Sequence, residues 1–147
     1  MKQRDHCIFC RIVSGEAPCS LVYEDELTLV FMDIQPVSRG HTLIITREHF
    51  ENLYEVSEQA IAAVACVSRR LAPAIRQVTA PDGLRVFQLN GAAAGQTVFH
   101  YHMHLIPRFT GQAEHFPGRV QADPTELAAV AAEIAAALGS GFPTQAN

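Results

Sequence analysis

Apolar residues recur along this chain with two different periods. Five stretches show the alternation or the β-branched content that is typical of strands: 21–24, 27–33, 41–46, 84–89 and 98–106. In the second stretch, Val30 and Met32 fall on one face of the predicted strand, opposite Leu29 and Phe31. The loop 90–96 joins the last two stretches, which are therefore expected to pair as a hairpin.

A longer stretch over 61–78 repeats apolar residues at spacings of three and four, which is typical of a helix with one buried face. Ser57 is a suitable N-cap for this helix. Pro73 lies inside the repeat, and a proline removes one backbone hydrogen bond and crowds the preceding turn. The sequence therefore predicts a kink or an early end near Leu71.

A second long helix is predicted over 124–138, with Asp123 as its N-cap, and a short helix over 8–13. Strands and helices in this order, joined by short turns, predict an α+β fold: an antiparallel five-stranded sheet with two main helices packed on it. The 147 residues suffice for one hydrophobic core, so we expect a single domain over 1–147.

Composition and charge exclude several classes of protein. The chain is 48% hydrophobic and 18% charged, as ordinary globular proteins are. Its apolar runs fall short of the roughly 20 residues that span a bilayer. Residues 1–10 lack the apolar segment of a secretory signal, so we expect a cytoplasmic protein with no membrane partner. A net charge of −4 and a pI near 5.9 offer no basic surface for a nucleic-acid polymer, so phosphate is expected on a single small ligand.

The stretch FHYHMHLIP, residues 99–107, places His100, His102 and His104 at alternate positions. On a strand these three would share one face, and the apolar residues between them would share the core face. A solvated surface gains little from three imidazoles in register, which leaves two chemical interpretations. Imidazole is a common metal ligand and also a nucleophile that can attack phosphorus. Three side chains of one strand lie too far apart to converge easily on one ion, whereas two can, with a third ligand from elsewhere.

The preceding stretch NGAAAGQT, residues 90–97, supplies groups that can surround an anion. They are the Asn90 amide, the backbone N–H groups near Gly95 and Gln96, and the Thr97 hydroxyl. None of these groups carries a fixed positive charge. Because clustered imidazoles disfavour one another's protonation, a neutral histidine nucleophile beside this loop is a consistent hypothesis.

The row HYHMHLI resembles the signature of the histidine triad (HIT) superfamily, in which three histidines alternate with apolar residues. The surrounding NGAAAGQTVFHYHMHLIPRF is similar to the bacterial branch, and the resemblance extends from CIFCRIVSGEAP, which starts at Cys7, to Phe109. It implies the HIT-like fold and a purine nucleotide-conjugate hydrolase or nucleotidyl transferase. His102 matches the histidine that attacks the α-phosphate. A nucleotidyl-histidine intermediate then forms, and water releases the monophosphate.

The resemblance also implies roles for residues around the central histidine. His104 matches the histidine that contacts the phosphate, Thr97 a proton donor to the leaving group, and His41 an additional supporting histidine. Asp33 matches the carboxylate that accepts hydrogen bonds from the ribose hydroxyls. The phosphate-contacting positions match Asn90, Gly95 and Thr97. The apolar walls around the base match Ile8, Phe9, Phe31, Ile34 and Leu43, for which simple core packing is the alternative.

Cys7 and Cys10 form a CxxC pair, which is half of a structural zinc motif but equally fits a redox pair or a chance spacing. No second CxxC follows, so two further ligands would have to be histidines. The resemblance supplies them, because zinc-carrying members use the positions that match His49 and His100. Two thiolates and two imidazoles would give a closed, tetrahedral, structural Zn²⁺ site of zero net charge.

The resemblance is compatible with more than one leaving group. Hydrolysis of nucleoside phosphoramidates is the first expectation. Hydrolysis of diadenosine polyphosphates is the alternative, because Pro107-Arg108 also occurs in members that split dinucleoside polyphosphates. A nucleotide-binding regulatory protein without turnover and a metal-dependent hydrolase that uses the histidines as ligands remain open. Members usually pair through the long helix and the following strand, so we expect a homodimer with 84–89 at its interface.

Overall fold

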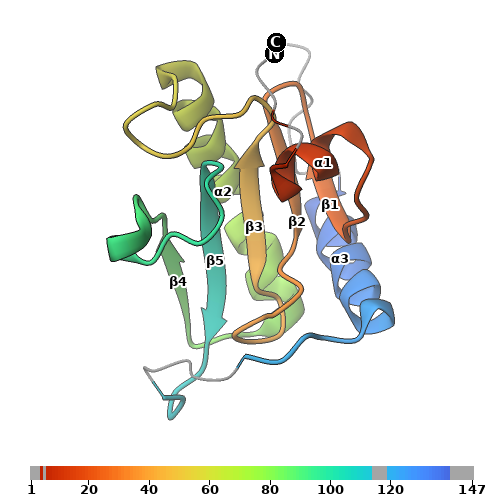
Figure 1. Cartoon of the computed structure of the whole chain (residues 1–147). Helices are drawn as coiled ribbons and strands as arrows, with labels where there is room; N and C mark the ends of the chain where they lie inside the picture. The colour runs from red at the N-terminus through yellow and green to blue at the C-terminus, as the bar shows by residue number, and fades with distance from the viewer. Residues whose placement is uncertain (1–3, 5, 114–118, 140–147) are drawn as a thin grey trace.

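The computed structural model describes residue 4 and residues 6–113 and 119–139. Its five strands form one antiparallel sheet in the order β1-β2-β3-β5-β4 (Figure 1). The strands are β1 Leu21–Glu24, β2 Thr28–Met32, β3 Thr42–Thr46, β4 Gly83–Phe87 and β5 His102–Arg108. The predicted α+β fold is confirmed, and so is the hairpin of β4 and β5.

Two long helices cover one face of the sheet, and a short helix lies on the other (Figure 1). The helices are α1 Ile8–Ser14, α2 Glu58–Thr79 and α3 Pro124–Leu138. Val30 and Met32 point into the main core beneath α2 and α3. On the opposite face, Phe9 of α1 packs with Leu29 and Phe31 in a smaller cluster. The alternation predicted for this strand is therefore confirmed, with both faces buried.

Both long helices begin at the predicted caps. The Ser57 hydroxyl accepts the N–H of Ala60 at 3.1 Å, and the Asp123 carboxylate accepts the N–H of Thr125 at 2.9 Å. These bonds satisfy N–H groups that have no partner within the helix. Among the described residues, no helix is long and apolar enough to cross a membrane.

The long helix α2 does not end near Leu71, so the early end was wrong, and the kink stays a prediction. It continues through Pro73 to Thr79. Leu71, Ala74 and Ile75 are buried on both sides of the proline. Packing of this face against the core therefore outweighs the single hydrogen bond that the proline removes.

β5 begins at His102 rather than at residue 98, so the prediction of three histidines on one strand was wrong for His100. The N–H of Tyr101 donates to the Phe50 carbonyl at 2.7 Å, and the Tyr101 carbonyl accepts the N–H of Thr46. Thr46 is the last residue of β3, and the next bond goes to Phe50 in the loop after it, so the ladder does not continue to residue 98. β4 also ends two residues earlier than predicted.

Replacing Pro73 by alanine should raise the free energy of unfolding, by up to about 3 kcal/mol, because the new N–H can bond to the preceding turn. Urea denaturation measures the change. Pro124→Ala is the matched control: this proline occupies the first turn of α3, where no intrahelical N–H bond is lost, and little change is expected. A less stable Pro73→Ala protein would show that the proline ring itself contributes more through packing than the hydrogen bond would.

Candidate functional site

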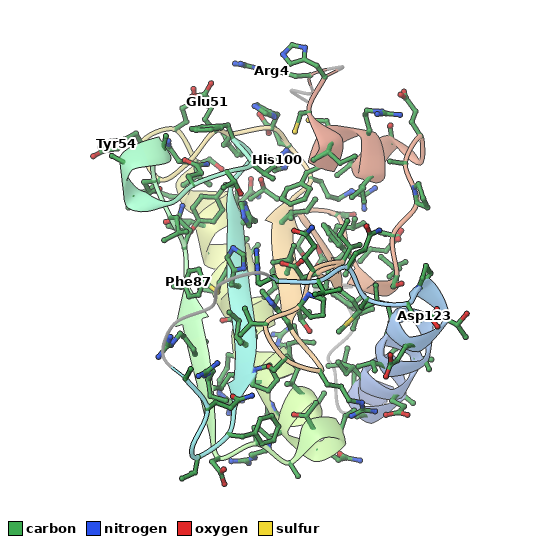
Figure 2. The ribbon with its side chains drawn as sticks, turned by 60° about the horizontal axis from the view of Figure 1, so that its bottom comes forward. Arg4, Glu51, Tyr54, Phe87, His100 and Asp123 are labelled. Carbon is green, nitrogen blue, oxygen red and sulfur yellow. The ribbon has the colours of Figure 1, made fainter. Side chains whose placement is uncertain are left out.

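The four predicted metal ligands meet between α1 and the start of β5. Cys7 is the N-cap of α1, and Cys10 lies in its first turn. His49 lies in the loop after β3, and His100, which Figure 2 labels, lies just before β5. Sγ of Cys7 lies 3.3 Å from Nδ1 of His100. Sγ of Cys10 lies 3.2 Å from Nδ1 of His49 and 3.6 Å from Nδ1 of His100. All four ligand atoms lie within 4.8 Å of one another.

The geometry of this cluster fits a tetrahedral ion. With zinc–sulfur bonds of ~2.3 Å and zinc–nitrogen bonds of ~2.0 Å, sulfur and nitrogen ligands stand about 3.6 Å apart. Nε2 of His100 donates to the carbonyl of Thr46 at 2.6 Å, so the lone pair of Nδ1 faces the thiols. Burial raises the pKa of the Cys10 thiol to about 11. A thiolate at this position therefore needs a neighbouring cation.

The backbone holds His102 in one tautomer. Its Nδ1 lies 2.6 Å from the carbonyl oxygen of His100, and because a carbonyl only accepts, Nδ1 carries the proton. Nε2 is left with the lone pair that a nucleophile needs. The ring is 9% exposed and meets the ring of Phe9 edge to face. Burial lowers its pKa, so His102 is neutral near pH 7.

His104 is held in the complementary tautomer by His41. Burial lowers the pKa of both rings to about 3, so both are neutral. The N–H of Val37 donates to Nδ1 of His41 at 3.0 Å, which places the His41 proton on Nε2. Nε2 of His41 in turn donates to Nδ1 of His104 at 3.0 Å, so the His104 proton is on Nε2. His104 therefore offers an N–H where His102 offers a lone pair.

Asp33 and Arg119 lie beside these histidines. Oδ1 of Asp33 accepts the N–H of Gln35 at 2.8 Å. Oδ2 lies 3.4 Å from Nε2 of His41 and 3.9 Å from a guanidinium nitrogen of Arg119. Burial raises the pKa of the Asp33 carboxyl, while the Gln35 N–H and the charge of Arg119 oppose that rise. Sequence reasoning missed Arg119, because no pattern in 119–123 shows that this segment returns to the end of β2.

The loop ahead of β5 uses its predicted anion donors to hold its own shape. The backbone N–H groups of Gly95 and Gln96 donate to carbonyls of the same loop at 3.0 Å. The Gln96 side chain is 3% exposed, accepts the N–H of Gly91 at 2.7 Å and donates to the carbonyl of Glu51 at 2.6 Å. The structure thus differs from the expectation that these N–H groups face an anion. The N–H of Gly95 is bonded within the 3-10 turn Ala92–Ala94, and the N–H of Gln96 is bonded to the carbonyl of Gly91.

Asn90 and Thr97 lie at the two ends of this loop. The Asn90 amide exchanges hydrogen bonds with the Gln88 side chain at 2.7 and 2.9 Å and accepts the N–H of Leu53 at 2.7 Å. Asn90 therefore braces the loop. Thr97 is exposed and lines a cavity of about 360 Å³ together with Ile8, Cys7 and His49, so this cavity lies beside the metal-ligand cluster rather than beside His102. Of the polar side chains predicted in this loop, Thr97 is the one that faces open space.

The predicted base walls divide into buried and exposed residues. Phe9, Phe31 and Leu43 are buried in one cluster between α1 and the sheet. The rings of Phe9 and Phe31 meet edge to face with their centroids 5.5 Å apart. Ile8, which precedes Phe9 in the chain, is 43% exposed. Ile34, three residues after Phe31, is 55% exposed. The three buried residues therefore pack as core, whereas Ile8 and Ile34 are accessible to solvent.

Phe87 is a second residue that sequence reasoning missed. It is the cross-strand partner of His104, and its ring stacks on the imidazole with the centroids 4.5 Å apart and the planes at 21°. The register of the β4–β5 hairpin creates this contact. Alternation within each strand does not reveal the register between two strands.

Comparison with known proteins identifies the family. The family model for the HIT domain matches residues 14–111, which is most of the chain. The chain belongs to the HIT family. Among its HIT relatives, Protein hit of Bacillus subtilis is 42% identical over 141 residues, which cover 92% of this chain and 97% of that protein.

Two further HIT proteins bear on the site. Adenylylsulfatase HINT3 of Arabidopsis thaliana is 41% identical over 105 residues, which cover 71% of this chain and 53% of that protein, so the match spans about half of it. The crystal structure of a Zn-bound histidine triad family protein from Mycobacterium smegmatis matches with a TM-score of 0.79 and 39% identity, over 90% of this chain and 93% of that one. These likenesses confirm the histidine triad assignment and its fold.

The hydrogen bonds predict one defined tautomer for each imidazole of the HIT site. At about pH 7.5, one unit above the usual imidazole pKa of about 6.5, His102 should be neutral with its proton on Nδ1, because burial lowers its pKa. His41 and His104 should be neutral with their protons on Nε2. Nitrogen-15 NMR of labelled protein distinguishes these states, and the urea-denatured protein supplies the reference titration. An imidazolium at His102, or a neutral ring with its proton on Nε2, would contradict the geometry.

Proposed function

We propose that this HIT protein hydrolyses purine nucleotide conjugates through a nucleotidyl-histidine intermediate on His102. The HIT superfamily comprises nucleotide-binding proteins and nucleotide hydrolases. The observation that carries the proposal is the 2.6 Å contact between Nδ1 of His102 and the carbonyl oxygen of His100. It leaves Nε2 unprotonated in a buried, neutral ring, as an attacking imidazole requires.

In the first step, Nε2 of His102 forms a bond to the α-phosphorus while the bond from phosphorus to the leaving group breaks. The leaving group departs with the electron pair and takes up a proton, which the exposed Thr97 hydroxyl relays from water. Nε2–H of His104 donates to a phosphoryl oxygen as negative charge develops there.

In the second step, water attacks the same phosphorus and the N–P bond breaks. The nucleoside monophosphate leaves with the hydroxyl of that water, and His102 recovers its lone pair. The proton that water releases replaces the one taken up by the leaving group, so the protein returns to its starting state. Val37 and His41 keep the His104 proton on Nε2 through both steps.

The nucleoside is assigned to Asp33 and the apolar cluster. Oδ2 of Asp33 has contacts of 3.4 and 3.9 Å, both longer than a good hydrogen bond, so it can accept the ribose hydroxyls. Phe9 and Phe31 lie in the apolar floor for the base, together with Leu43. The exposed Ile8 and Ile34 complete the proposed walls. Asn90, Gly95 and Gln96 are assigned to holding the loop that presents Thr97.

Nucleoside phosphoramidates are the proposed substrate class. Among the described residues, Arg119 is the cation beside Asp33 and the histidines. A polyphosphate leaving group carries several negative charges, which one cation would not balance. A protonated leaving amine carries none, which suits a site of neutral imidazoles. Diadenosine polyphosphates are the competing substrates. The name of the Arabidopsis relative, adenylylsulfatase, fits chemistry at an adenylyl group.

Cys7, Cys10, His49 and His100 are the proposed ligands of a structural zinc ion. The sulfur–nitrogen distances of 3.2 to 3.6 Å and the Zn-bound mycobacterial relative support this assignment. A bound ion would tie the start of α1, which supplies Cys7 and Cys10, to the loop after β3, which supplies His49, and to the residue His100 ahead of β5. The lone pairs of His102 and His104 take no part in that cluster.

A homodimer through β4 is the proposed assembly. β4 is the last strand of the sheet order, so one of its edges has no neighbouring strand in the described chain. Val86 of this strand is 48% exposed. An unpaired edge beside an exposed apolar side chain is suited to pairing with the same strand of a second copy.

Replacing His102 by alanine should lower kcat/KM for adenosine phosphoramidate by at least about a thousandfold, because the attacking atom is lost. Steady-state rates measure this, and the exposed His6→Ala is the matched control. Wild type quenched during turnover in alkaline denaturant should carry the nucleotidyl group on His102. Chelator treatment should not prevent the adduct from forming in folded protein. Retained turnover in His102→Ala, or a label on another residue, would refute the proposal; binding without any turnover would indicate a regulator.

The zinc assignment predicts about one zinc per chain in protein purified without chelators. Cys10→Ser should lose most of the metal and lower the Tm by at least about 10 °C, because the ion links two segments of the fold. Elemental analysis and thermal denaturation measure the two effects. His102→Ala should keep its zinc. A metal-free wild type whose Tm does not respond to added zinc would contradict the assignment.

A further inference from the structure

Arg119 reaches the site from a segment that is far from it in sequence. Residues 119–123 precede α3, and the N–H of Ala122 donates to the carbonyl of Ile34 at 2.9 Å. Ile34 directly follows Asp33, so this bond holds the segment along the end of β2. The Arg119 side chain is 35% exposed, and its guanidinium lies 3.9 Å from the Asp33 carboxylate, whose side chain is 12% exposed.

The two oxygens of Asp33 have different surroundings. Oδ1 accepts the N–H of Gln35 at 2.8 Å, which fixes the orientation of the carboxylate. Oδ2 contacts Nε2 of His41 at 3.4 Å and Arg119 at 3.9 Å. The His41 proton has a shorter partner in His104, at 3.0 Å. Oδ2 is therefore close to positive charge but keeps its lone pairs available for a ligand.

We propose that Arg119 is a positioning residue for the sugar of the nucleotide: it holds Asp33 as an oriented carboxylate without occupying the oxygen that ribose hydroxyls need. This inference rests on the proposed function, since it takes a nucleotide as the ligand. On this proposal, Arg119 is responsible for the preference of the site for ribonucleotides over nucleotides that lack the 2′ and 3′ hydroxyls.

The electrostatics of the neighbouring groups agree with this assignment. Burial alone favours the protonated form of the Asp33 carboxyl, whose O–H would donate a hydrogen bond instead of accepting one. The positive charge of Arg119 opposes this protonation. The same charge disfavours protonation of His41 and His104. One guanidinium thus supports an ionised carboxylate and neutral imidazoles in adjacent positions.

The test compares two ligands with four proteins. Calorimetry gives the Kd of AMP and of 2′,3′-dideoxy-AMP for wild type, Arg119→Ala, Arg119→Lys and the surface control Arg69→Ala. We expect Arg119→Ala to weaken AMP binding by about tenfold or more, as the loss of charge-assisted hydrogen bonds does. Lysine should restore binding to within about threefold, because it keeps the charge. Dideoxy-AMP should bind more weakly than AMP to wild type and should be unaffected by Arg119→Ala.

Each other outcome overturns the assignment. Equal losses for the two ligands would mean that Arg119 contacts the phosphate or supports the fold, and unchanged AMP binding would mean that it has no role. Equal affinity of wild type for both ligands would mean that Asp33 does not hold the ribose. A failure of the proposed function would give a different result. Wild type would then still bind AMP more tightly than dideoxy-AMP and respond to Arg119→Ala, but it would hydrolyse no conjugate.

Discussion

The site depends on the three hydrogen-bonding groups of one residue, His100. Its Nε2–H bonds to the carbonyl of Thr46, its Nδ1 faces the thiols of Cys7 and Cys10, and its own carbonyl accepts the Nδ1 proton of His102. The chain can make all three contacts only because it leaves the β-ladder before His102. In a regular strand the backbone of His100 would be used for pairing with β3, whereas here its carbonyl accepts from His102. As a result, Nδ1 of His100 joins the cluster of Cys7, Cys10 and His49, and the ring nitrogens of His102 and His104 do not.

Burial and backbone groups together determine the protonation of the remaining imidazoles. Desolvation keeps His41, His102 and His104 neutral, and a neutral imidazole must choose between two tautomers. Main-chain atoms make that choice, through the His100 carbonyl at one end and the Val37 N–H at the other. Since main-chain groups do not titrate, the arrangement of donor and acceptor is as permanent as the fold. Asp33 is the exception, because its state depends on the balance between burial and the charge of Arg119.

The sequence predicted those features that depend on local periodicity, and missed those that depend on distant contacts. Alternation gave the strands and the correct faces of Val30 and Phe31, and the caps at Ser57 and Asp123 were read from residue type alone. The early helix end predicted from Pro73 was wrong, because local propensity does not include the burial of the residues around the proline. The Cys7–Cys10 spacing indicated half of a cluster, and only the family resemblance pointed to His49 and His100. Arg119 and Phe87 were missed because their contacts depend on a returning segment and on strand register. Gly95 and Gln96 were expected to face an anion, but a loop must first satisfy its own polar groups.

The stacking of Phe87 on His104 connects β4, the edge strand of the sheet, directly to the histidines of the candidate site. β4 is the outermost strand, and Phe87 is the last residue of it. A shift of this strand by one position would turn the phenyl ring to the other side and leave one face of the imidazole without its cover. A molecule that bound to the free edge of β4 would therefore also restrain the ring that covers His104, so binding at this edge and the geometry of that imidazole are physically coupled.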